Sequence, residues 1–293
     1  MDQNIREFNR QVNSVVEQIQ IVEQYSVVDG AEAAQRRYLA EGQLYRLLAQ
    51  LKLFAIEMGL FPRMQGIIVA LEERVERLPQ GPSFPAIREV QSLREFPNLC
   101  ILVAEERSEH GQELAELGHL TITDRVGSVL FDHDLPPLQA TSLSFARQHS
   151  IPLSTADTEA IAVMTALWPD LLSVIRGRFL LSEDIILTQV QLMVTAERFD
   201  LEVPVVIGES MVMLYQKYLT LPVSREVQGA PFPIDLLTLV RQFGIPFPGS
   251  PHLSALDRAM GILHVLHAMA QGLVPKSSLP STPGRSIDED CDQ

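Results

Sequence analysis

Polar side chains follow several short apolar runs in the middle of the sequence, at points where a ligand could bind. Arginine side chains can hold anionic groups through paired hydrogen bonds, and free N–H groups at the start of a helix can do the same. These residue types predict a site for a small polar ligand. The candidate ligand-binding residues are Arg107, Asp124, Arg125, Asp132, Asp134, Ser154, Thr155 and Asp157.

The apolar runs have the length and composition of buried strands. They are NLCILVAEE (98–106), HLTIT (119–123), SVLF (128–131) and IPL (151–153), and helices are expected at about 108–117, 138–148 and 156–168. Such an order is typical of a small α/β module with a largely parallel sheet. Because the carboxyl ends of parallel strands gather at one edge of a sheet, we expect the candidate residues to line a crevice there.

An alternative interpretation needs no ligand. Connecting loops are polar in most proteins, and Ser154, Thr155 or Asp157 could serve only to cap the helix that follows. Both interpretations remain open from the sequence.

Residues 98–168 resemble a small α/β regulatory domain. The pattern runs from CILVAEE through a helix ending AELG, then HLTIT, SVLF, a helix ending ARQHS, and IPLSTADTEAI. It is similar to the DRTGG domain and to the N-terminal domains of HPr kinase/phosphorylase and of PucR-type regulators. DRVGS (124–128) lacks the paired glycines of the DRTGG string. The resemblance implies a regulatory or ligand-sensing module and assigns no catalytic residue.

Two other motifs could bind metal, and neither is complete. Asp132 and Asp134 of FDHDLPP could converge while His133 points away, because successive strand residues alternate in direction. His264 and His267 share a helix face without an acidic neighbour. No nucleophile elbow, phosphate-binding loop or dinucleotide fingerprint occurs. The sequence therefore predicts no catalytic residue, no metal site and no cofactor.

The N-terminal segment carries apolar residues at alternating steps of three and four. This spacing is the seam of a coiled coil over three heptads and predicts a homo-oligomer, or alternatively a helix that lies on its own core. The candidate oligomerisation residues are Ile5, Phe8, Val12, Val15, Ile19 and Val22.

The fold class expected is mainly α-helical with an embedded small α/β module. The predicted segments are an N-terminal amphipathic helix (1–27), a helical region (31–97), the α/β module (98–168), a helical C-terminal region (169–273) and a disordered acidic tail (274–293).

The composition limits the classes of partner. A net charge of −14 disfavours nucleic acid, since each phosphate contact needs a local Arg or Lys. The chain has no secretion signal and no apolar run of membrane-spanning length, and its two cysteines lie far apart. These features predict a soluble cytoplasmic protein that binds no membrane.

The preferred hypothesis is a non-enzymatic regulatory or scaffolding protein. Its α/β module would sense a small polar ligand or bind a protein partner, and its N-terminal helix would self-associate. One alternative is a viral or phage-like structural protein of the capsid or nucleocapsid kind, with a helical arm and a tail around a helical core. Another is an enzyme with its active site at the carboxyl edge of the sheet.

Overall fold

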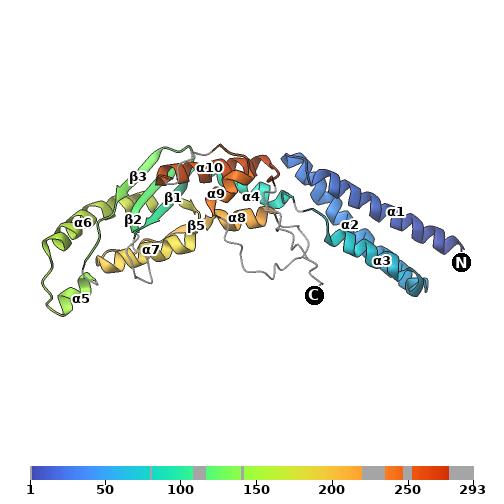
Figure 1. Cartoon of the computed structure of the whole chain (residues 1–293), viewed down its shortest axis with the longest axis horizontal. Coiled ribbons are helices and arrows are strands. Elements are labelled where there is room, and N and C mark those ends of the chain that lie inside the picture. The colour runs from blue at the N-terminus through green and yellow to red at the C-terminus, as the bar shows by residue number, and fades with distance from the viewer. Residues whose placement is uncertain are drawn as a thin grey trace, which may run out of the picture.

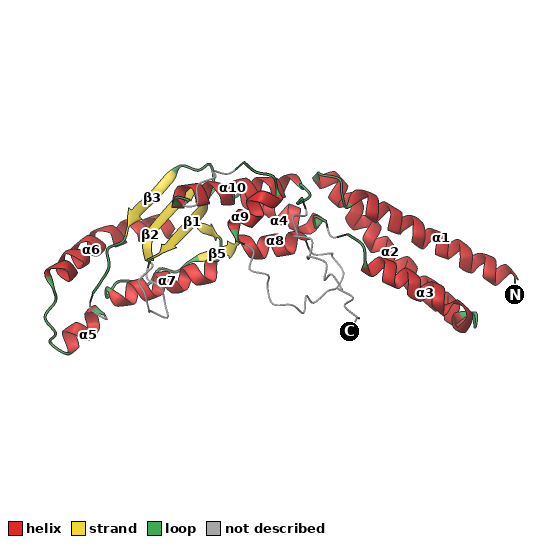
Figure 2. Ribbon diagram, in the orientation of Figure 1, coloured by secondary structure: helices red, strands yellow, loops and turns green. Residues whose placement is uncertain are grey.

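The computed structural model describes residues 2–79, 81–107, 117–139, 142–219, 235–246 and 253–276. The described elements form an elongated molecule in which a helical arm extends from an α/β body (Figures 1 and 2). The expectation of a mainly α-helical protein with a small α/β module is confirmed. The predicted tail lies outside the described residues from 277 onward.

The arm consists of α1 (Asp2–Tyr25), α2 (Ala31–Glu57) and α3 (Phe61–Glu76), and the N-terminus lies at its free tip (Figure 1). Gly30 forms the turn between α1 and α2 with a φ of 115°, a conformation that favours glycine. Its N–H donates a 2.8 Å hydrogen bond to the carbonyl of Gly272, which ends a helix of the body. This turn attaches the arm to the body.

The predicted oligomerisation seam of α1 lies inside the arm. All six seam residues pack in one apolar cluster with residues of α2 and α3, and Phe8, Val15, Ile19 and Val22 are fully buried. The other two, Ile5 and Val12, are partly buried against the same cluster. The seam is occupied within the chain because α2 supplies the partner surface. The structure thus corrects the prediction that the seam faces another copy.

A buried ion pair lies at the base of the arm. Arg37 and Glu41 are one turn apart on α2, their charged atoms are 2.6 Å apart, and their side chains are only 2% and 3% exposed. Burial raises the pKa of Glu41, and the contact with Arg37 opposes that rise. Gly81 packs against the Arg37 guanidinium so closely that a methyl group there would overlap it. The pair therefore fixes the chain where it leaves the arm.

The body is built on one mixed five-stranded sheet with the order β3-β2-β1-β4-β5. β1 pairs antiparallel with β2, and β2 antiparallel with β3, whereas β1 with β4 and β4 with β5 are parallel pairs. The bounds are β1 (Leu99–Glu106), β2 (Leu117–Asp124), β3 (Val129–Asp134), β4 (Phe179–Ser182) and β5 (Ile207–Ser210).

Helices cover both faces of this sheet (Figure 2). Leu99, Ile101 and Val103 of β1 point into one apolar cluster, and Cys100 and Leu102 point into the other, as the two-residue period of a strand requires. The first face is covered by α4 (Phe84–Glu95), α8 (Met211–Leu219), α9 (Leu236–Gln242) and α10 (Ala255–Gln271), and the second by α6 (Thr155–Ile175) and α7 (Ile185–Arg198). The short helix α5 (Leu143–Gln148) precedes α6.

Three details of the predicted sheet are wrong. The sheet is mixed instead of largely parallel, because residues 125–128 form a hairpin turn between β2 and β3. Residues 151–153 are not a strand, since Pro152 cannot donate to a strand ladder. The place beside β1 is taken by β4, and the sheet therefore extends beyond residue 168 into the region predicted to be helical. The helix predicted at 108–117 falls largely outside the described residues.

The helix α6 is long and apolar enough by composition to cross a membrane, and it is the one described helix that meets this test. It also packs on the sheet through buried residues that include Met164, Trp168 and Leu171. A core helix of a folded domain passes the same test of length and composition. Only 28% of the apolar window of α6 is buried, so packing on the sheet accounts for part of its apolar side chains.

Candidate ligand-binding cleft

A cleft of about 310 Å³ opens at the carboxyl ends of the parallel neighbours β1 and β4. Leu102 and Val103 of β1 and Leu187 of α7 provide apolar lining. The main polar groups are Glu106, Ser182, Glu183, Asp184, Gln191 and Arg258. The expected crevice at the edge of the sheet is therefore present, but Arg107 and the other seven predicted ligand-binding residues are not part of its lining.

The turn from β4 into α7 positions one side of the cleft. Asp184 is the N-cap of α7, and its Oδ1 accepts hydrogen bonds from the N–H groups of Ile186 (3.0 Å) and Leu187 (3.1 Å). The N–H of Ile185 donates to Ser210 Oγ, and that of Thr188 donates to the Asp184 carbonyl. All four N–H groups at this helix start are thus bonded within the protein. They are not free to hold an anion.

Arg258 of α10 closes the opposite side of the cleft. Its guanidinium makes two hydrogen bonds to Glu183, of 3.2 and 2.9 Å, and both side chains are 29% exposed. Burial opposes the charged form, but the hydrogen bond to Glu183 and the negative charges of Glu183 and Glu105 together outweigh it, so the pKa of Arg258 is raised. This guanidinium is the one cationic side chain among the described lining residues, and Glu183 neutralises it.

Acceptor groups remain available in the cleft. The Oε1 of Glu106 accepts a 2.8 Å hydrogen bond from Gln191 Nε2. Ser182 is only 1% exposed, and its Oγ has no hydrogen-bond partner among the described residues. Buried hydroxyl groups are nearly always hydrogen-bonded, and leaving one unpaired costs about 1–3 kcal/mol. Because this oxygen exposes less than 1 Å², a ligand that donates hydrogen bonds would remove the cost once the Ser182 side chain turns toward the cleft.

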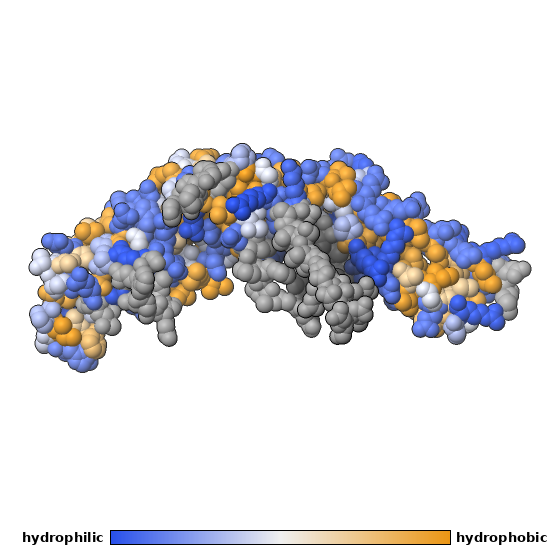
Figure 3. All heavy atoms as spheres, viewed as in Figure 1, coloured by the Kyte–Doolittle hydropathy of each residue, from blue (hydrophilic) through white to orange (hydrophobic). Residues whose placement is uncertain are grey.

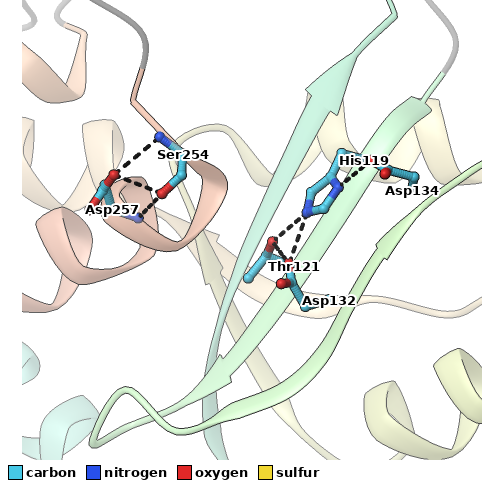
Figure 4. A network of polar contacts seen from close by, with 6 residues as sticks. All are labelled: His119, Thr121, Asp132, Asp134, Ser254 and Asp257. Carbon is cyan, nitrogen blue, oxygen red and sulfur yellow. Dashed lines mark hydrogen bonds and ion pairs between the residues drawn. The ribbon is translucent and has the colours of Figure 1, made fainter. Parts of the chain in front are cut away.

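The predicted residues Asp132 and Asp134 do converge, on a histidine that the sequence analysis did not single out (Figure 4). His119 lies between them, with Nε2 2.8 Å from Asp132 Oδ1 and Nδ1 2.8 Å from Asp134 Oδ1. Thr121 also donates to Asp132, at 2.6 Å. Partial burial disfavours the imidazolium, but the two aspartates outweigh it and raise the pKa of His119.

The register of β2 and β3 explains this cluster. His119 pairs with Asp134, and Thr121 pairs with Asp132, so the two-residue period places all four side chains on one face. The alternation of HLT and DHD was visible in the sequence. Finding the cluster also required the antiparallel pairing.

Arg107 lies near the same end of the sheet and donates a hydrogen bond to the carbonyl of Leu135. Asp124 and Arg125 lie at the opposite end, because β2 runs antiparallel to β1 and Asp124 pairs with Cys100. Asp124 accepts hydrogen bonds from the N–H groups of Val126 and Ser128 and so stabilises the hairpin turn. The prediction that all these residues share one rim is wrong.

Ser154 and Asp157 cap the start of α6. The Oγ of Ser154 accepts from the Asp157 N–H, and Asp157 accepts from the Ser154 N–H, which completes a capping box. Asp157 is 4% exposed and also accepts a 2.7 Å hydrogen bond from the N–H of Gln139. Thr155 is exposed in the first turn. Ser154 and Asp157 therefore cap the helix that follows them, as the interpretation without a ligand expected.

Among the described residues, no three His, Cys, Asp or Glu side chains gather as metal ligands. Searches for a related sequence found no matching family model and no significantly similar curated protein. The function is therefore argued from the geometry of the cleft.

Proposed function

We propose that the protein is a cytoplasmic, non-enzymatic regulatory or scaffolding protein whose α/β body binds a small organic cation in the cleft. The observation that carries this proposal is the pairing of an unpartnered buried hydroxyl, Ser182, with an acidic lining. Three carboxylates face one guanidinium in that lining, which gives it a formal charge of −2. A ligand with ammonium N–H donors would satisfy both features.

The lining favours an organic cation over an anion or a metal ion. An anion would meet carboxylates, bonded helix N–H groups and an arginine already held by Glu183. A divalent cation prefers several converging oxygen ligands, and among the described residues no three His, Cys, Asp or Glu side chains gather as such a group. The side chain of Leu187, which is 47% exposed in this lining, suits the methylene groups of an alkylamine.

Binding is favoured over covalent catalysis because the described lining lacks a nucleophile that is hydrogen-bonded to a base. Ser182 has no partner for its hydroxyl, and Thr188 donates to a backbone carbonyl. A serine nucleophile needs a neighbouring base to remove its proton.

Calorimetry with 1,4-diaminobutane tests this proposal. We expect saturable binding to the full chain at one diamine per chain, and no binding of 1,4-butanediol or succinate, which share the carbon chain but not the charge. Glu106→Gln should raise the dissociation constant about tenfold, because it removes a charged acceptor. Glu159→Gln, which removes the same charge from the exposed side of α6, should leave binding unchanged. Binding of succinate, or equal affinity in the Glu106 variant, would contradict the proposal.

A self-assembling structural protein of the capsid or nucleocapsid kind is the second candidate. The projecting arm favours it, since an arm of this shape can reach a neighbouring subunit (Figure 1). The net charge of −14 counts against the packaging of nucleic acid. Filaments or shells in electron micrographs of the purified protein, with an absorbance ratio typical of nucleoprotein, would place this candidate first.

A further inference from the structure

The helix α2 carries a second apolar stripe on the side that faces away from α1. Leu39, Leu53 and Ile56 are large apolar side chains that are 60%, 59% and 59% exposed. Together with Gly42, Arg46 and Ala49 they recur at alternating steps of three and four, which is the spacing of a coiled-coil seam. Hydrophobic side chains are visible on the outer surface of the arm (Figure 3). Such a stripe is suited to pairing with another helix.

The described residues of the chain leave this stripe uncovered. The face of α2 that includes Leu44 and Leu51 is buried in the core of the arm. The contact of Lys52 with Glu72 of α3 closes the flank next to the stripe. Buried residues on one side and the exposed Leu39, Leu53 and Ile56 on the other give α2 apolar side chains on two of its faces. A surface helix that covers only its own core needs just one apolar stripe.

We infer that a second copy of this chain docks on the stripe, with its own α2 antiparallel to the first. The stripe is complementary to itself in that orientation. When Arg46 of one copy lies against Ala49 of the other, Leu53 meets Gly42 and Leu39 meets Ile56. A Cβ added at Gly42 would meet nothing within 4 Å, so the space above it is open to receive a leucine. Large side chains therefore meet small ones at the centre, and apolar ones meet at both ends.

The residues beside the stripe are compatible with this pairing. Gln43 and Gln50 flank one edge and would meet across the dimer as uncharged hydrogen-bonding groups. Arg46 is the one charged residue within the stripe, and its Nε donates a 3.1 Å hydrogen bond to the carbonyl of Gly42. Two arginines near the centre limit the affinity. Because the same surface is used on both copies, the assembly closes as a dimer and does not grow into a filament.

Sedimentation velocity of the full chain over a range of concentrations tests the inference. We expect a reversible dimer. Leu53→Asp should raise its dissociation constant at least tenfold, and Gly42→Leu should do the same by filling the space that Leu53 of the other copy occupies. Gly42→Leu also replaces a poor helix former by a good one, so a loss of dimer could not be ascribed to unfolding of α2. Arg46→Leu should lower the dissociation constant, because it removes the repulsion at the centre.

The matched control is Val126→Asp, which places the same charge on a side chain that is 73% exposed in the body, in the turn between β2 and β3. Its dissociation constant should equal that of the wild type. A wild-type chain that stays monomeric at all concentrations would overturn the inference, and so would a dimer that both Leu53→Asp and Gly42→Leu leave intact. The cleft lies in the body and takes no part in this contact between arms. Calorimetry with the diamine on the same variants therefore tests ligand binding separately from dimer formation.

Discussion

The arm and the body bury their apolar residues in different ways. In the arm, helices that are consecutive in the sequence pack on one another, and each contributes a stripe of its own to the cluster. In the body, β1 lies beside β4, so that Ile101 is opposite Leu181, and α10 from the far end of the chain covers the same sheet. The arm thus depends on local contacts, and the body depends on contacts between distant segments. The two regions should therefore respond separately to substitutions.

The largest expected effect is in the arm. Arg37→Met leaves Glu41 buried without its partner and should lower the free energy of unfolding by about 3 kcal/mol or more. Urea unfolding followed by far-UV circular dichroism measures it, while fluorescence of Trp168, the only tryptophan, reports on the body. The circular dichroism curve should shift more than the fluorescence curve. Arg36→Met, which breaks the exposed pair with Glu32, should change little. Equal effects of the two variants would contradict the role of burial.

A smaller effect is expected from a pair of glycine substitutions. A Cβ at Gly208 would overlap the Leu180 carbonyl across the β4–β5 pair, so Gly208→Ala should destabilise the body by about 2 kcal/mol. Gly66→Ala in α3 meets open space and should stabilise the arm by about 0.5–1 kcal/mol. Urea unfolding of both variants, with the same two signals, measures the difference. A stabilised Gly208→Ala would show that β5 is not held as described.

The smallest effect is a pH dependence confined to the body. The pKa of His119 is raised above its ordinary value of about 6.5, so its contribution to stability is fully present below that pH. The contribution is lost as the pH rises through the raised value. Asp134 is 93% exposed, and solvent screening therefore limits the change to less than about 1 kcal/mol. His119→Asn should abolish this change in urea unfolding followed by Trp168 fluorescence. An unchanged pH profile in that variant would assign the effect to other groups.

The same difference between regions decides what could be predicted from the sequence. Within the helical region expected at 31–97, α2 is observed at Ala31–Glu57, because the helical period of its buried apolar residues needs only local residues to define it. The seam of α1 was also found, but its spacing could not say whether the partner belongs to the same chain. In the body, IPL and FLLS are both short apolar runs before a capped helix, and only FLLS joins the sheet. The choice depends on which run pairs with β1, and local sequence does not contain that information.

The candidate site was likewise predictable only where it depends on local sequence. The edge of the sheet was expected to hold a cleft, and it does, but its residues come from the turn after β4 and from α10. Ser182, Glu183 and Asp184 fall in the region expected to be helical (169–273) and were not among the candidate ligand-binding residues. The sequence pattern that could have located this site is a strand followed by a polar turn into a helix. It was assigned to Ser154 and Asp157, which cap α6 instead.

The most direct test of a ligand-binding body joined to a dimerising arm is native mass spectrometry of the full chain with 1,4-diaminobutane, since one spectrum reports both subunit count and bound ligand. At a diamine concentration near the wild-type dissociation constant, we expect a dimer that carries diamine for the wild type, a shift toward a monomer that still carries diamine for Gly42→Leu, and a dimer with much less bound diamine for Glu106→Gln. A wild-type chain that binds no diamine, or a Glu106→Gln dimer that retains as much diamine as the wild type, would contradict the assignment of the cleft.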